Sequence, residues 1–248
     1  MDTKKIKNLF SAPLAMLFNL LLIYICYGLC RLLFIWVNHS YFTDLTFSHL
    51  CEMFRGGLFF DTSAIMYTNS IYIVLMLFPF HWKENKTYYK VVKWFFIVTN
   101  MICIIMNLMD TVYFRYTNRR TSNEDNVGKI IGIELLHNWY LVLVAALFCY
   151  GLIKLYRKAN VNPRGSLLLY YISYTVFLLV CVPFTIFGMR GGIGGDVRPI
   201  TLSNANQYVN RPAETAIVLN TPFSIYRTVG KKPFIVPSYF KDMQESEK

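Results

Sequence analysis

The chain has 248 residues, of which 55% are hydrophobic and 17% aromatic, whereas only 16% are charged. A soluble domain usually carries about 25% charged residues, so this composition excludes an ordinary water-soluble globular protein and indicates a membrane protein. The formal net charge of +11 raises the question of a nucleic-acid partner, but in a membrane protein the positions of the basic residues are more informative than their sum.

The apolar residues are gathered into blocks whose lengths are near the ~20 residues that cross a hydrocarbon layer. We expect five transmembrane helices, at Leu14–Val37, Leu58–Phe80, Val91–Met109, Trp139–Tyr156 and Leu167–Met189. The first block follows the basic leader MDTKKIKN, but it is longer than the apolar core of a secretory signal and no small-residue cleavage site follows it. The sequence therefore predicts an all-α membrane protein with a five-span transmembrane domain at residues 1–190.

The basic residues are distributed unequally between the two sides of these blocks. Eleven lysines and arginines lie on one side: they precede the first block, or lie between the second and third or the fourth and fifth blocks or in the adjoining three residues of those blocks. The opposite loops carry five. The positive-inside rule then places the N-terminus in the cytoplasm and, with five spans, the C-terminus outside. This distribution accounts for the net charge, so we expect no nucleic-acid partner.

Three charged residues within or at the end of the expected spans stand out: Arg31, Asp61 and Asp110. A charge inside a span costs about 2.5–3.5 kcal/mol on insertion scales, so each of them needs a partner or a function. With the expected topology, all three lie toward the outer face. The expected third span also carries Asn100 and Asn107 on the helical face of Asp110, and such a stripe is expected to face other helices.

Two interpretations of these polar residues remain open. In the first, Arg31 pairs with an aspartate and the asparagines bond across helices, a purely structural role. In the second, the outer ends of the helices form a pocket for an anionic lipid head group, because the forked arginine side chain binds two phosphate oxygens. The residues of such a site are Arg31, Arg55, Asp61, Asp110, Tyr113, Arg115, Arg119, Arg120 and Arg190, with Tyr116 as a second hydroxyl.

The loop RGGIGGDVRP, which follows the fifth block, does not match a nucleotide-binding loop, since it lacks both GxxxxGK[ST] and GxGxxG. We interpret it as the exit from the membrane, where glycine ends the helix and Arg190 complements the helix dipole. Residues 191–248 are then an extracytoplasmic segment with short amphipathic helices. Thr221 and Pro222 predict a helix start, and Phe223 and Tyr226 are expected in the membrane interface.

Metal-binding patterns are weak in this chain. No CxxC or Cys/His spacing predicts zinc, and five of the six cysteines fall inside the expected spans, where thiols act as small apolar groups. The outer loop residues His39, Asp44, His49 and Glu52 are a minor candidate cluster for a metal. We therefore expect no cofactor in this chain.

Three segments together resemble one family. RGGLFFDTSAIMYTN (Arg55–Asn69), MDTVYFRYTNRRTS (Met109–Ser122) and the long stretch Arg190–Thr228 are similar to the membrane part of lipoteichoic acid synthase-like sulfatases, in the form seen in Bacteroidetes. The resemblance implies five spans in a bacterial cytoplasmic membrane, followed by a linker and an extracellular catalytic domain with a threonine nucleophile and a divalent metal, usually manganese. Such enzymes transfer phosphoglycerol from a phospholipid or hydrolyse a sulfate or phosphate ester.

The resemblance also implies parts that the sequence does not contain. The buried strand, the metal ligands and the nucleophile of the catalytic domain are not found before Lys248, so no catalytic or metal residue is assigned and the chain alone is expected to be inactive. We expect a membrane anchor and lipid-presenting module, either a fragment or a separate subunit, with anionic phospholipid and a sulfatase-like domain as partners. The alternatives are a small lipid transporter and a purely structural membrane subunit.

Overall fold

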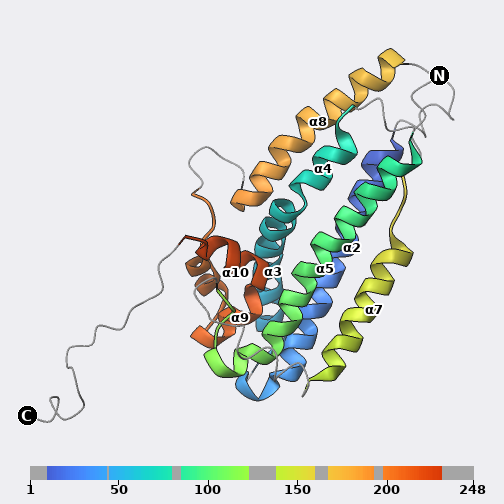
Figure 1. Cartoon of the computed structure of the whole chain (residues 1–248). Coiled ribbons are helices and arrows are strands. Elements are labelled where there is room, and N and C mark those ends of the chain that lie inside the picture. The colour runs from blue at the N-terminus through green and yellow to red at the C-terminus, as the bar shows by residue number, and fades with distance from the viewer. Residues whose placement is uncertain are drawn as a thin grey trace, which may run out of the picture.

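The computed structural model describes residues 10–43, 45–79, 85–122, 138–159, 167–192 and 198–230. Within these ranges every regular element is helical, which confirms the all-α expectation for the described part of the chain. Six helices form an elongated bundle (Figure 1): α2 (Ser11–Val37), α3 (Phe47–Thr68), α4 (Ser70–Leu77), α5 (Lys86–Thr117), α7 (Trp139–Leu155) and α8 (Leu167–Arg190). Four short elements follow: η4 (Leu202–Tyr208), η5 (Pro212–Glu214), α9 (Thr215–Val218) and α10 (Thr221–Thr228).

Three of the helices, α2, α5 and α8, are long and apolar enough to cross a membrane, and α3 with α4 makes a fourth candidate if the bent pair is one span. The apolar helix α7, with 17 residues, is shorter. The described residues thus contain three to four candidate spans, and the count of five remains a prediction. The largest differences from the predicted boundaries are in α3, which begins at Phe47, and in α5, which extends from Lys86 to Thr117.

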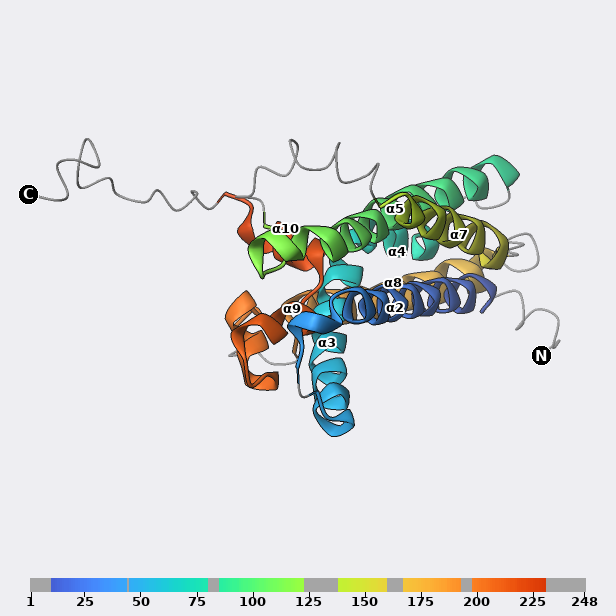
Figure 2. The same ribbon diagram turned by 90° about the horizontal axis from the view of Figure 1, so that it is seen from below.

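The bend between α3 and α4 measures 60° and has a local cause. The side chains of Thr68 and Asn69 donate to the carbonyl oxygens of Ala64 and Ile65, at 2.9 and 3.1 Å, and so compete with the backbone hydrogen bonds of the helix. Asn69 also exchanges two amide hydrogen bonds with Asn100 of α5, at 3.0 and 2.8 Å. As a result, the first turns of α3 point away from α2 and α5 (Figure 2).

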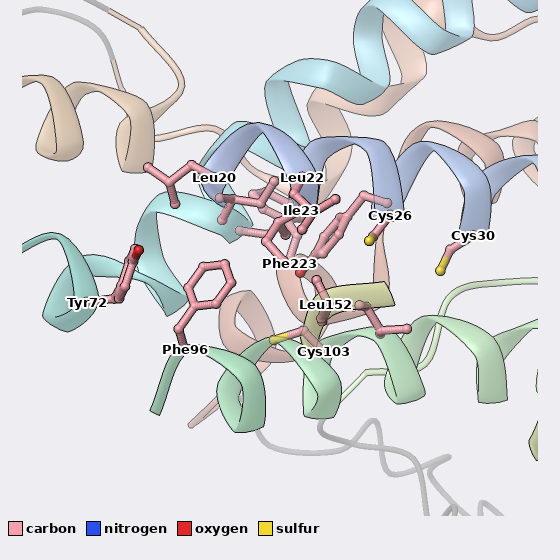
Figure 3. Close-up of a cluster of buried hydrophobic side chains, with 14 of the residues drawn as sticks. Leu20, Leu22, Ile23, Cys26, Cys30, Tyr72, Phe96, Cys103, Leu152 and Phe223 are labelled. Atoms are coloured by element: carbon pink, nitrogen blue, oxygen red, sulfur yellow. The ribbon is translucent and has the colours of Figure 1, made fainter. Parts of the chain in front are cut away.

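The core of the bundle lies between α2, α4 and α5. It includes fully buried aromatic side chains such as Tyr72 and Phe96, whose ring centroids are 4.5 Å apart. Cys26, Cys30 and Cys103 lie in the same core as free, buried thiols (Figure 3), so these three act as small apolar groups, as expected.

The helix α8 ends where the glycines predict. Arg190 is its last residue, and Gly191 adopts a left-handed conformation with φ of +79° while its N–H bonds to the carbonyl of Phe187. A side chain at position 191 would also meet Ile200, which packs against this turn. Most of the remaining glycine loop, residues 193–197, lies outside the described residues.

We use "C-terminal segment" for residues 198–230. The expectation that this segment lies in the membrane interface, with Phe223 and Tyr226 facing lipid, is wrong for Phe223. Its ring is 0% exposed and meets Phe60 of α3 edge to face, with ring centroids 4.9 Å apart. Tyr226 stacks on Tyr67 at 4.5 Å. The segment therefore folds back onto the end of the bundle, where α9 and α10 pack against α3 and α5 (Figures 1 and 2).

Candidate functional site

The first ion pair of the site joins α2 to α3. Arg31 donates from both terminal nitrogens to the two carboxylate oxygens of Asp61, each at 2.7 Å. The two side chains are 3% and 1% exposed. This confirms that Arg31 pairs with one of the two aspartates. A forked contact of this kind is the strong form of a charge-assisted hydrogen bond, and it removes both charges from the lipid environment together.

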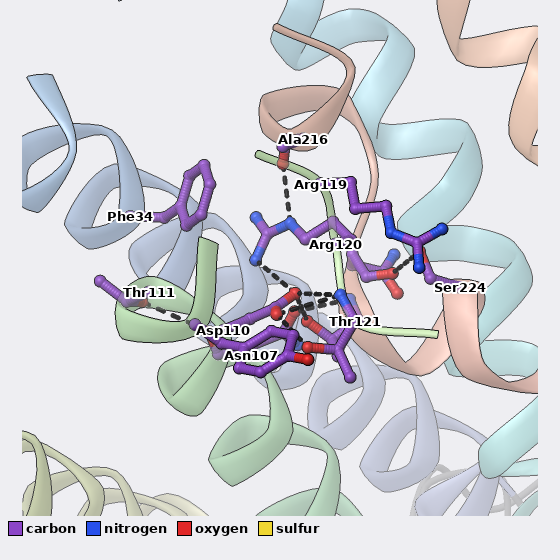
Figure 4. Close-up of polar contacts among 12 residues, drawn as sticks. Phe34, Asn107, Asp110, Thr111, Arg119, Arg120, Thr121, Ala216 and Ser224 are labelled. Atoms are coloured by element: carbon purple, nitrogen blue, oxygen red, sulfur yellow. Dashed lines mark hydrogen bonds and ion pairs between the residues drawn. The ribbon is translucent and has the colours of Figure 1, made fainter. Parts of the chain in front are cut away.

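The second ion pair lies at the end of α5. Asp110 accepts hydrogen bonds from the backbone N–H and the hydroxyl of Thr121, and the Nη1 atom of Arg120 lies 3.5 Å from its Oδ2 atom (Figure 4). The Arg120 guanidinium also stacks over Phe34 of α2, 3.9 Å from the ring centroid. Burial lowers the pKa of Arg120, and the neighbouring Asp110 opposes that shift. We call these four residues, Arg31, Asp61, Asp110 and Arg120, the ion network.

The two arginines of the ion network also hold the short helix α9. The last carbonyl groups of any helix lack partners within the helix. Here the carbonyl oxygen of Ala216 accepts from Nε of Arg120 at 2.7 Å, and that of Ile217 accepts from Nε of Arg31 at 2.8 Å. The carbonyl of Val218 accepts from Arg31 at 3.3 Å. A helix of one turn is thereby capped by side chains of the bundle rather than by its own sequence.

The two carboxylates hold the start of α10 in a matching way. Asn220 donates to Asp61 at 2.9 Å, and the hydroxyl of Thr221 donates to Asp110 at 2.7 Å. The side-chain oxygen of Asn220 caps the helix by accepting from the N–H of Phe223 at 2.8 Å. The cap is thus Asn220, one residue before the predicted Thr221. Each aspartate binds one arginine of the bundle and one residue of the C-terminal segment.

A further pair anchors the C-terminal segment nearer its start. Nε2 of His49 lies 3.0 Å from a carboxylate oxygen of Glu214, which also accepts from the backbone N–H groups of Asn210 and Arg211. Burial raises the pKa of Glu214, but the hydrogen bonds from His49 and the two N–H groups outweigh it, so the net pKa is lowered. Glu214 is therefore bound in its charged form.

This shift predicts a pH dependence for the C-terminal segment. A lowered folded-state pKa contributes stability above the unfolded pKa of Glu, about 4.3, and this contribution disappears as the pH falls through the folded value. In the wild-type chain, we expect the amides of residues 210–218 to lose protection against hydrogen exchange, relative to an unfolded chain, below about pH 4. In the Glu214→Gln variant, the same amides should be less protected at neutral pH, and their protection should not fall further below about pH 4. An equal loss of protection on acidification in both proteins would show that Glu214 is not the group responsible.

The remaining predicted site residues are not part of the ion network. Arg55, Arg115 and Arg119 have exposed side chains, Arg190 is half-buried, and Tyr113 is buried with 8% of its surface exposed. The structure therefore brings together Arg31, Asp61, Asp110 and Arg120 under α9 and α10. It leaves Arg55, Arg115 and Arg119 on the surface.

Sequence reasoning missed the partners that the C-terminal segment supplies. Asn220, Thr221 and Glu214 belong to a stretch for which the sequence predicts the membrane interface, and Thr121 is not among the predicted site residues. The Asn-Thr-Pro run at 220–222 carries a local helix-start signal, but nothing in it indicates that both polar side chains bond to aspartates more than a hundred positions earlier.

Buried polar residues also occur far from the ion network. Asn19, near the start of α2, bonds to the hydroxyl of Tyr72 at 2.9 Å and to both backbone groups of Arg157, at 2.8 and 3.0 Å. Buried polar side chains therefore occur near both ends of α2. Asn19 fastens the chain beyond α7 to α2 and α4, which is a structural role.

No group of three histidine, cysteine, aspartate or glutamate side chains in the described part of the chain is placed to hold a metal ion. In the minor cluster considered above, His49 is bound to Glu214, His39 contacts the carbonyl of Trp36, and Asp44 lies outside the described residues. The chain matches no protein-family model, no curated protein and no solved structure.

Proposed function

We propose that this chain is the membrane anchor and lipid-presenting module of a lipoteichoic acid synthase-like phosphoglycerol transferase or sulfatase. The observation that carries the proposal is the convergence of the three segments on which the resemblance depends. Asn220 of the third segment bonds to Asp61 of the first, Thr221 bonds to Asp110 of the second, and Arg120 of the second bonds to Ala216 of the third. Residues with one shared tertiary role support the interpretation of these segments as one family pattern.

The geometry suits an anchor for a domain outside the membrane. The C-terminal segment is fastened to α2, α3 and α5 by charge-assisted hydrogen bonds, most of them buried, and Phe223 fills a site against Phe60. The C-terminal segment is thereby held in one position against the bundle. The same end of the bundle exposes Arg55, Arg115 and Arg119, which would attract an anionic phospholipid.

In this proposal α7 and the bent pair α3–α4 both cross the bilayer, so that five spans place the N-terminus in the cytoplasm and the C-terminus outside. A reporter that is active only outside the cytoplasm should be active when fused after Lys248 and silent when fused after Lys86. The reverse pattern would overturn the orientation, and activity at both sites would overturn the five-span count.

The anchor role is tested by activity and composition together. The purified 248-residue chain, supplied with Mn²⁺ and phosphatidylglycerol, should show no phosphoglycerol transfer and no hydrolysis of phosphate or sulfate esters. Material isolated through an N-terminal tag from the cells that produce the chain should contain a sulfatase-type domain, either in the same polypeptide or as a bound partner. Turnover by the 248-residue chain alone, or native material without such a domain, would reject the proposal.

A further inference from the structure

The end of α8 and the helix α10 meet at one corner of the molecule, joined by Ser63 of α3. The hydroxyl of Ser63 donates to the carbonyl oxygen of Met189 at 2.5 Å and lies 2.6 Å from the hydroxyl of Tyr226. Met189 precedes Arg190 at the end of α8, and Tyr226 precedes Arg227 in α10. The Ser63 contacts therefore hold two arginines of distant elements at the same corner, where the end of α8 lies beside α10 (Figure 1).

Arg227 has an unused donor in this corner. Its guanidinium lies over the rings of Tyr226 and Phe223, 5.2 and 5.7 Å from their centroids. Its Nε atom is shielded from solvent and has no hydrogen-bond acceptor within the described ranges. Leaving a buried donor of a charged group unsatisfied is costly, so this nitrogen points to an acceptor supplied by another molecule.

A third arginine reaches α10 from another element. Figure 4 shows the side chain of Arg119, which follows α5, directed toward Ser224 of α10. Ser224 and Arg227 are three positions apart in a helix and so share one face. Arg227 thus belongs to α10, while Arg119 follows the end of α5 and Arg190 is the last residue of α8. The Asn220 cap and the Tyr226–Ser63 contact fix the position of α10 between them.

The surface that leads to this corner is apolar. Only 11% of the most apolar stretch of α8 is buried inside the protein. Val180, Phe184 and Ile186 expose 50%, 64% and 47% of their surfaces. In a bilayer this surface is covered by acyl chains, and it ends at Arg190. A phospholipid lying along α8 therefore brings its head group to the corner formed by Arg190 and Arg227.

We propose that this corner, made of Arg119, Arg190, Tyr226 and Arg227, binds the phosphate of one anionic phospholipid whose acyl chains lie against α8. The forked guanidinium groups bind phosphate oxygens in pairs, and Arg227 supplies the Nε–H that lacks an acceptor. The inference rests on the lipid-presenting role proposed above and makes it specific, because it replaces a diffuse basic surface by a site with one buried donor.

The test measures binding of fluorescent phosphatidylglycerol to the purified chain in a phosphatidylcholine-containing micelle. Arg227→Gln should weaken this binding about tenfold or more, the loss expected for a charge-assisted hydrogen bond to phosphate. Arg55→Gln and Arg115→Gln remove the same charge from exposed positions of α3 and α5 that supply only general electrostatic attraction, so each should weaken binding by less than about threefold. Arg227→Lys, which keeps the charge without the fork, should fall between wild type and Arg227→Gln.

The outcomes separate this site from the broader proposal. Equal losses in all three glutamine variants would overturn the defined site and leave only electrostatic attraction to the basic end of the bundle. No binding of phosphatidylglycerol above phosphatidylcholine would overturn both. Displacement of the lipid by equimolar soluble glycerol phosphate would show a phosphate site without lipid dependence and overturn the acyl-chain contact. If Arg227→Gln lowers the unfolding midpoint, Arg190→Gln replaces it in the same assay, and unchanged binding there rejects the site.

Discussion

Replacing Asp61 by asparagine is expected to lower the free energy of unfolding by about 3–5 kcal/mol, the usual effect of removing one partner from a buried ion pair. Arg31 would retain its charge at 3% exposure without a carboxylate to neutralise it. Asn220 would also lose the charged acceptor of its side-chain N–H group. The measurement is the thermal unfolding midpoint in one detergent, compared between wild type and variant.

Glu52→Gln is the matched control, because Glu52 is an exposed carboxylate on the same helix and the substitution removes the same charge. A surface charge change of this kind should alter stability by no more than about 0.5 kcal/mol. Equal midpoints for Asp61→Asn and Glu52→Gln would contradict the role of the Arg31–Asp61 pair. Hydrogen exchange gives a second measurement, since residues 215–228 should become less protected before the bundle itself unfolds.

The double variant Arg31→Met, Asp61→Leu tests whether the pair serves the bundle or the C-terminal segment. Apolar residues often replace a buried ion pair without loss of stability. Here, however, the replacement also removes the donors to Ile217 and Val218 and the acceptor of Asn220. We expect the double variant to keep a folded bundle but to expose residues 215–228 to protease. A folded bundle whose residues 215–228 still resist protease would show that the C-terminal segment does not depend on the pair.

Substituting Gly57 by alanine is expected to have the second large effect, about 3 kcal/mol of lost stability. A Cβ atom at this position would lie 2.6 Å from Cζ of Arg31. A free arginine side chain would move aside, but this guanidinium is held by Asp61 and by the carbonyls of Ile217 and Val218. The added methyl group must therefore break the forked contact of a buried pair.

Gly28 of α2 provides the control, because a Cβ atom there meets nothing within 4 Å. Alanine is a better helix former than glycine, so Gly28→Ala should be neutral or should stabilise the chain by up to about 1 kcal/mol. The two variants carry the same chemical change, and their unfolding midpoints should move apart. If Gly57→Ala shifts the unfolding midpoint no more than Gly28→Ala does, then the guanidinium of Arg31 moves aside at little cost, and its contacts do not fix its position.

The local sequence pattern was sufficient to predict that the protein is all-helical and to predict where several helices end. Apolar blocks of about 20 residues identified α2, α5 and α8, because a helix in a membrane needs an apolar surface along its whole length. The glycine after Arg190 marked the end of α8, since a left-handed residue there requires no side chain. Pattern also indicated that Arg31 needs a carboxylate, because an unpaired charge within a span is costly.

The boundaries of α3 and α5 were less accurate because hydropathy identifies the apolar part of a helix and not its polar turns. Both helices extend through mixed sequence beyond the predicted blocks, α3 at its start and α5 at both ends, where caps and tertiary contacts stabilise them. Thr46 accepts a hydrogen bond from the N–H of His49 at the start of α3, and Arg120 and Thr121 bind Asp110 beside the last turns of α5. The amino-acid composition of these turns only weakly indicates such contacts.

The position of the C-terminal segment was decided by tertiary structure alone. Read locally, residues 215–228 are amphipathic and suit a membrane surface, and they can equally be covered by protein. The bend at Thr68–Asn69 turns the start of α3 away from α2, and the segment packs beside it. The sequence by itself determined that two aspartates and an arginine within the spans require partners. The partners that they take in the C-terminal segment lie 111 to 187 positions away along the chain, and short-range periodicity carries no information at that separation.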